Sequence, residues 1–148
     1  MVNKIERSAL VWHSAERMFG LVNDVVAYPQ FLPWCASAEV HHTNEQEITA
    51  SLEVAKGGMR QRFTTRNQLV APSEIQMVLV DGPFTRLKGC WRFHSLDERA
   101  CKVQLTLEFE FTGTLARMAF GTVFNQAANT LVDAFCKRAN DVYGASLL

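Results

Sequence analysis

One long helical pattern in the last quarter of the sequence limits the fold more than any other feature. Residues 114–143 contain no proline, which would break or kink a helix. Apolar residues recur there three or four positions apart, which places them on one stripe of an α-helix. They are Phe120, Phe124, Ala127, Ala128, Leu131, Phe135, Ala139 and Val142. The pattern predicts an amphipathic helix about 45 Å long, whose apolar stripe needs a broad partner.

Glycines mark both ends of this predicted helix. Gly113 and Thr114 precede it as a break and a candidate N-cap, and Gly144 follows it where a left-handed backbone is favoured. Gly121 lies inside the pattern, where a glycine costs about 1 kcal/mol relative to alanine. Two interpretations of Gly121 remain open: a tolerated glycine, or the close approach of a ligand or loop.

A two-residue period replaces the helical one between positions 36 and 112. Apolar and polar residues alternate over 38–43, 48–54, 61–70, 75–80, 87–94 and 103–111, and turn-forming residues separate these segments. The gaps are too short for parallel crossovers, so the six strands are predicted to form an antiparallel meander.

The N-terminal segment completes the predicted fold. Residues 4–12 indicate a further strand, Ser14 offers a cap for a short helix, and Pro29 and Pro33 exclude a regular helix after it. The chain, residues 1–148, is therefore expected to form one α+β domain. We expect a curved antiparallel sheet of about seven strands around the long C-terminal helix, with one or two short helices after the first strand.

Charge and cysteine content narrow the classes of function. Fifteen basic residues balance fifteen acidic ones, so only a local patch could attract nucleic acid or an anionic membrane. The four cysteines include no Cys-x-x-Cys pair, which favours small buried hydrophobic roles over a metal or redox role. The charged N-terminus and the lack of an 18-residue apolar run predict a cytoplasmic protein, free or peripheral at the inner membrane.

Aromatic and flexible side chains are concentrated on the predicted concave interior. A curved sheet closed by one helix can leave a hydrophobic pocket, and ligand pockets measure about 300–1,000 Å³. The candidate lining residues are Phe31, Trp34, Met77, Phe84, Trp91, Phe93, Phe109, Phe120 and Phe124. The same residues would also suit a dry core, so both interpretations remain open.

The sequence contains no recognisable catalytic or metal-binding motif. Its four histidines have no companion serine, cysteine or carboxylate in a nucleophile motif, and it lacks a glycine-rich phosphate loop. His41 and His42 are adjacent and point to opposite faces of a strand, which does not suit a shared metal. We therefore expect no enzyme, no catalytic residue and no required cofactor, and an enzymatic activity is the least favoured alternative.

Six cations share the polar phase of two strands that have one strand between them. They are Arg60, Arg62, Arg66, Arg86, Lys88 and Arg92. Such strands lie about 10 Å apart in a meander, so the cations would form a basic outer face. That face could contact RNA phosphates, and a solvated face without a partner is the alternative.

Several segments in a fixed order resemble a known family. They are 28–35 (YPQFLPWC), 63–67 (FTTRN), 81–84 (DGPF), 109–111 (FEF) and 119–124 (AFGTVF), with Leu87, Gly89, Trp91 and Phe93 among them. Spread over about residues 8–143, they are similar to the coenzyme Q-binding, START-like family of the polyketide cyclase superfamily. Within it, the sequence most resembles a subgroup of ribosome-association toxins.

The resemblance implies a helix-grip fold of the START-like and Bet v 1-like type. It also implies a lipid-type pocket with Phe31 and Trp34 at its entrance. The leading expectation is noncatalytic binding of ubiquinone or a related polyprenyl lipid, linked to respiration. The alternative is a toxin that binds the 50S ribosomal subunit, blocks 70S association and inhibits translation initiation, with a RatB-like protein as antitoxin.

Overall fold

The computed structural model describes residues 2–144, and its elements follow the order predicted from the sequence. Strand β1 (Asn3–Val11) precedes helix α1 (Ala15–Asn23) and the 3-10 helix η1 (Val25–Gln30). The remaining strands are β2 (Cys35–Thr43), β3 (Glu47–Lys56), β4 (Met59–Val70), β5 (Glu74–Asp81), β6 (Phe84–Asp97) and β7 (Ala100–Phe111). Helix α2 (Thr114–Tyr143) follows them and has the predicted bounds.

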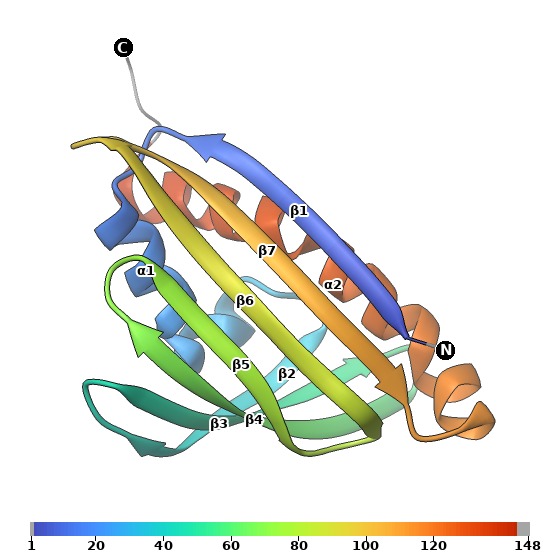
Figure 1. Cartoon of the computed structure of the whole chain (residues 1–148). Helices are drawn as coiled ribbons and strands as arrows, with labels where there is room; N and C mark the ends of the chain where they lie inside the picture. Colours follow the sequence, from blue (N-terminus) through green and yellow to red (C-terminus); the bar gives the residue numbers. More distant parts are fainter. Residues whose placement is uncertain (1, 145–148) are drawn as a thin grey trace.

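The seven strands form one antiparallel sheet in the order β1-β7-β6-β5-β4-β3-β2. Strands β2 to β7 make the expected meander, and β1 pairs with β7 from far along the chain, with Ile5 opposite Leu107. Figure 1 shows the sheet curving around α2, which lies across its concave side. The structure therefore confirms the predicted helix-grip architecture.

Local sequence signals set the ends of the α-helices. The Ser14 side chain accepts a hydrogen bond from the Arg17 backbone N–H at 3.1 Å, and so caps α1 as predicted. Gly144 ends α2 with φ of 86°, a left-handed value that glycine adopts without steric penalty. The prediction of Thr114 as N-cap is wrong, because Thr114 is the first helical residue and Gly113 is the cap.

The two prolines after α1 exclude an α-helix but not all helical structure. Pro29 lies inside η1, whose tighter turn ends at Gln30. The Tyr28 carbonyl accepts backbone hydrogen bonds from Phe31 and Leu32, which folds this segment back toward β2.

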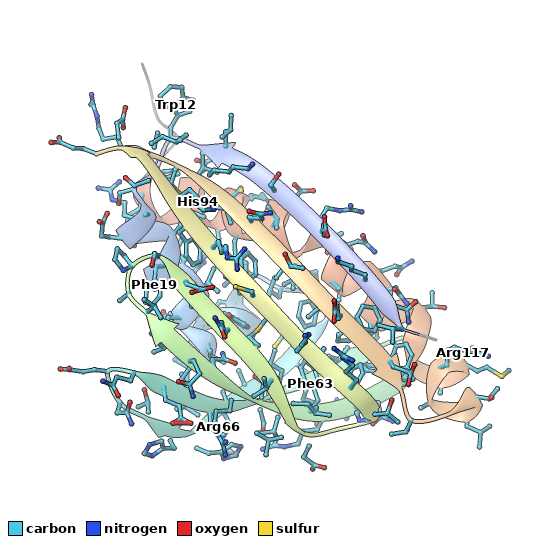
Figure 2. The ribbon with its side chains drawn as sticks, viewed as in Figure 1. Trp12, Phe19, Phe63, Arg66, His94 and Arg117 are labelled. Atoms are coloured by element: carbon cyan, nitrogen blue, oxygen red, sulfur yellow. The ribbon has the colours of Figure 1, made fainter. Side chains whose placement is uncertain are left out.

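The core consists of two packed clusters along α2. One contains Phe84, Phe109 and Phe120 near the start of the helix, and the other contains Phe135 near its end. Strand alternation sets which side chains reach these clusters. Phe63 and Arg66, labelled in Figure 2, belong to the same strand, yet Phe63 is buried and Arg66 is exposed.

The buried stripe of α2 differs from the predicted one, because it includes Gly121 and Val132, whereas Leu131 is half-buried and Val142 is exposed. Val132 is buried although it was not predicted, and Val142 is 48% exposed although it was. Val132 continues the four-residue spacing from Phe124 and Ala128, so it stays on the stripe that faces the sheet.

Gly121 packs against the sheet, beside the ring of Phe111. A Cβ added there would lie 3.5 Å from Cε2 of Phe111 and 3.5 Å from Cγ of Arg117, which is ordinary van der Waals contact. Gly82 is different, because its φ is 151° and an added Cβ would lie 2.7 Å from Cβ of Phe63. Of the two interpretations of Gly121, the structure favours the tolerated glycine.

These two glycines give a matched test of the packing. Gly121→Ala should raise the free energy of unfolding by about 0.5–1 kcal/mol, because alanine favours the helix and fits without displacement. Gly82→Ala should lower it by about 2 kcal/mol through the clash and the unfavourable φ. Urea unfolding of both variants measures the difference, and a destabilised Gly121→Ala protein would contradict the packing described for α2.

Candidate functional site

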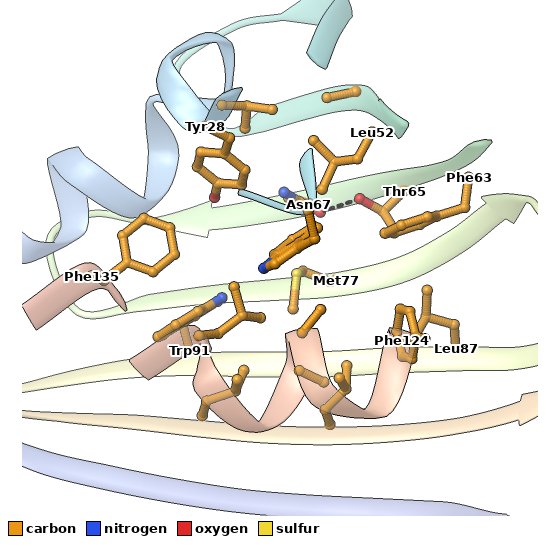
Figure 3. Close-up of a pocket in the computed structure, with 18 residues that line it drawn as sticks. Tyr28, Leu52, Phe63, Thr65, Asn67, Met77, Leu87, Trp91, Phe124 and Phe135 are labelled. Atoms are coloured by element: carbon orange, nitrogen blue, oxygen red, sulfur yellow. Dashed lines mark hydrogen bonds between the residues drawn. The ribbon is translucent and has the colours of Figure 1, made fainter. Parts of the chain in front are cut away.

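An internal cavity of about 90 Å³ lies between α2 and the concave face of the sheet. Its walls come from strands β3 to β7, from η1, from Trp34 and from the middle of α2. Figure 3 shows Trp91, Met77 and Phe124 around it. On the helix side, the small side chains of Ala127 and Ala128 lie between three bulkier lining residues, Phe124, Leu131 and Phe135.

The cavity is smaller than the sequence suggested. Ligand pockets usually measure about 300–1,000 Å³, whereas this volume would hold several water molecules. A small ring could enter with modest side-chain movement. A polyprenyl chain would require the walls to move apart.

The structure brings together only part of the predicted lining. Trp34, Met77, Trp91 and Phe124 line the cavity. The other predicted residues do not: Phe31, Phe84, Phe93, Phe109 and Phe120.

Each of these five aromatic residues packs elsewhere for an identifiable reason. The ring of Phe84 is stacked on that of Phe111 at 5.3 Å, and Phe109 and Phe120 lie at its edge in a solid cluster. The ring of Phe93 meets that of Phe19 of α1 at 5.9 Å, which covers it on the helix side. The sequence prediction included these five residues because alternation identifies the inner face of the sheet but not the part of that face that borders a cavity.

Phe31 lies on the flank of the cavity. Its ring packs edge-on against that of Phe135 at 5.2 Å, and the guanidinium carbon of Arg138 lies 4.9 Å from its ring centre. Tyr28, which does line the cavity, donates its hydroxyl hydrogen to the Val22 carbonyl. Burial raises the pKa of Tyr28, so the phenol keeps that proton.

Two polar side chains interrupt the apolar lining. Asn67 and Thr65 of β4 both border the cavity, and the Thr65 hydroxyl donates to Oδ1 of Asn67 at 3.0 Å. The sequence analysis missed this pair. A signal was available, because both residues share the inward phase of β4 with Phe63, where apolar side chains are expected.

On the outer face of the sheet, each of the six predicted cations is paired with a carboxylate. The distance between the paired nitrogen and oxygen atoms is 3.0 Å in Arg62–Glu39 and 3.0 Å in Arg66–Glu47. The other pairs are Arg60–Glu53, Arg86–Glu108, Lys88–Glu108 and Arg92–Glu74. The face is thus mixed in charge and not basic, because β2, β3, β5 and β7 bring glutamates beside the cations.

The structure also assembles a histidine with a serine and a glutamate, which the sequence analysis did not foresee. His41 Nε2 lies 2.7 Å from Ser51 Oγ, and His41 Nδ1 lies 3.5 Å from Glu39 Oε1. Ser51 is only 1% exposed and its hydroxyl also bonds that of Thr64. A substrate carbonyl cannot reach a hydroxyl covered in this way, so the arrangement is a polar network between strands.

The four cysteines are all free thiols, and two of them are buried. Burial raises the pKa of Cys35 and of Cys101 to about 11 each. Burial and the neighbouring Glu74 carboxylate raise the pKa of Cys90 to about 11 as well. Within residues 2–144 no group of three or more metal-ligating side chains comes together, and no described helix is long and apolar enough to span a membrane.

The chain is similar over nearly its full length to two bacterial proteins. The profile of the family described as polyketide cyclase / dehydrase and lipid transport matches residues 11–136. Ribosome association toxin RatA of Pseudomonas aeruginosa is 51% identical over 97% of this chain and 100% of that protein. RatA of Escherichia coli strain K12 is 48% identical over 96% of this chain and 90% of that protein.

Two further proteins are more distant. The mitochondrial coenzyme Q-binding protein COQ10 homolog B of Xenopus laevis is 29% identical over 93% of this chain, which spans 58% of that protein. The Zhui aromatase/cyclase of Streptomyces sp. R1128 has a TM-score of 0.83 at 19% identity, with 99% of this chain and 100% of that chain covered. At that identity the likeness establishes the fold alone.

The raised thiol pKa values predict low reactivity. At pH 8 a thiol with pKa about 11 is ionised about a hundredfold less than one with pKa about 9, so a disulfide reagent should modify native Cys35 and Cys101 slowly. Because the folded pKa lies above the unfolded one, the two thiols stabilise the fold at neutral pH and lose that contribution as the pH rises from about 9 to 11. Absorbance-monitored labelling in buffer and in urea measures this, and equal rates would contradict it.

Proposed function

The chain belongs to the polyketide cyclase / dehydrase and lipid transport family, and from this premise we propose that it is a noncatalytic ribosome-association protein of the toxin type. The observation that carries the proposal is the 51% identity to a ribosome association toxin across the whole of that protein. Its expected target is the 50S subunit, where binding would block 70S association in the cytoplasm. A RatB-like antitoxin would be its antagonist.

We place the ribosome contact on the outer face of the sheet, at Arg60, Arg62, Arg66, Arg86, Lys88 and Arg92. These cations are about half exposed and already have carboxylate partners, so ribosomal phosphates would have to replace glutamates. Exposed ion pairs contribute only about 0.2–1 kcal/mol each, so the exchange is energetically accessible. The neighbouring glutamates would limit the affinity and make it depend on salt.

A second candidate function is binding of a small apolar molecule, and the cavity beneath α2 favours it. Its apolar walls suit such a guest, and burial would supply about 25 cal/mol per Å² of apolar surface. Ubiquinone is the less supported ligand. The coenzyme Q-binding relative is 29% identical, and a polyprenyl tail would not fit into about 90 Å³.

Charge reversal on the outer face tests the ribosome proposal. Arg62→Glu, Arg66→Glu and Lys88→Glu together should abolish most co-sedimentation with 50S subunits. The slope of log affinity against log salt should fall by about 2–3 units, because each phosphate contact contributes about 0.7–0.9. A control triple, Arg99→Glu, Arg117→Glu and Lys137→Glu, changes the net charge equally in the β6–β7 turn and on α2.

The two triple variants, compared with the wild type, distinguish a wrongly placed binding surface from a wrong function. If both pellet with 50S subunits as the wild type does, the outer face is the wrong surface. If the wild type itself fails to associate with subunits and leaves 70S formation unchanged in sucrose gradients, the proposed function is wrong.

Removal of the competing carboxylates should have the opposite effect. Glu39→Gln and Glu47→Gln free the guanidinium groups of Arg62 and Arg66 for phosphates. Each substitution should tighten 50S binding by about two- to fivefold at low salt. Glu16→Gln on α1 and Glu98→Gln in the β6–β7 turn are the matched controls, and an equal gain in these controls would indicate a net-charge effect only.

A further inference from the structure

A buried amide faces the cavity without a partner for its nitrogen. Asn67 is 9% exposed and belongs to β4, between Ile48 of β3 and Met77 of β5. Its Oδ1 accepts the hydrogen bond from Thr65, and its Nδ2 donates to no group among residues 2–144. The fully buried polar atoms without a partner in residues 2–144 are His13 Nδ1 and Asn23 Oδ1, so Nδ2 of Asn67 keeps contact with open space, and Asn67 borders the cavity. The two N–H groups can therefore bind an acceptor that occupies the cavity.

Thr65 indicates the direction of that donor. Its hydroxyl lies 3.0 Å from Oδ1 of Asn67, two positions along the same inward face. With Oδ1 held on this side, Nδ2 is turned toward the cavity. Figure 3 shows the Asn67–Thr65 bond, with the amide nitrogen of Asn67 on the opposite side, toward Tyr28, which also lines the cavity.

A second donor points the same way. The indole N–H of Trp91 borders the cavity and has no acceptor among the described residues. In Figure 3 the indole nitrogen lies on the edge of the Trp91 ring that faces Met77 and the middle of the cavity. The unpaired polar groups of both residues are therefore donors.

From this arrangement we propose that the cavity selects an apolar molecule that carries a carbonyl-type acceptor oxygen, seated against Nδ2 of Asn67. The inference rests on the second proposed function, the binding of a small apolar molecule. Burial of apolar ligand surface against the cavity walls favours binding, and a ligand without an acceptor would leave the donors unpaired. Water can satisfy the amide in the free protein, so a carbonyl ligand replaces that bond whereas a hydrocarbon loses it.

Two probes of nearly the same shape test the proposal. Acetophenone and α-methylstyrene differ only in the exchange of a carbonyl oxygen for a CH₂ group. Calorimetric titration of each into wild type and Asn67→Leu gives the ratio of their affinities. That ratio should fall by about three- to tenfold in Asn67→Leu, because one neutral hydrogen bond is lost.

Further variants guard against an indirect effect. Thr65→Val, which frees the amide to turn, should lower the ratio partway. Gln68→Leu makes the same kind of change next to Asn67 but on the exposed face of β4, and should leave the ratio unchanged. Asn67→Leu is expected to fold, because leucine suits an apolar wall, and far-ultraviolet circular dichroism checks this.

Amide resonances give a readout that a purely structural role would not affect. In nitrogen–proton correlation spectra, acetophenone should move the Asn67 Nδ2 protons downfield, and α-methylstyrene should not. If both probes bind and the ratio is the same in wild type and Asn67→Leu, the acceptor proposal is overturned while apolar binding stands. If neither probe binds the wild type, both proposals for the cavity fail, and ribosome association is unaffected.

Discussion

The packing of α2 against the concave face of the sheet determines where this molecule is solid and where it is hollow. The buried stripe of the helix begins with the large Phe120 and Phe124, continues with the small Ala127 and Ala128, and has larger side chains again at Val132 and Phe135. The large rings fill the space up to the sheet, and the alanines do not reach it. The cavity therefore lies in the middle of the helix, between two dry clusters.

Strand β4 carries parts of both candidate surfaces because its side chains alternate. Thr65 and Asn67 face the cavity, and Arg62 and Arg66 face outward. A single shift of register would exchange these two sets. The pairing with β3 and β5 fixes the register, so it supports the internal site and the outer face together.

The outer face illustrates how neighbouring strands change the meaning of a charge pattern. The sequences of β4 and β6, taken alone, predict a basic surface. The sheet adds glutamates from β2, β3, β5 and β7, so every one of those cations gains an acidic neighbour: Glu39, Glu47, Glu53, Glu74 or Glu108. A ribosome-binding role consequently depends on exchange of partners and not on a free positive patch.

The sequence by itself determined the elements and their order. Periodicity located α2 and the strands, Ser14 located the start of α1, and short gaps determined the antiparallel meander. These signals are local, because hydrogen-bond geometry and side-chain direction repeat every few residues. The ordered motifs also indicated the family, which the comparisons establish.

Only the tertiary structure decided which inner-face residues border open space and which carboxylates pair with the cations of the outer face. Phe84 and Phe124 look alike in sequence, yet only Phe124 borders the cavity. The difference arises because a void, its volume and an ion pair depend on side chains brought together from distant positions. Asn67 combines the two kinds of information. The alternation of β4 places its side chain on the inner face, but only the tertiary structure shows that its amide nitrogen has no hydrogen-bond acceptor at the cavity.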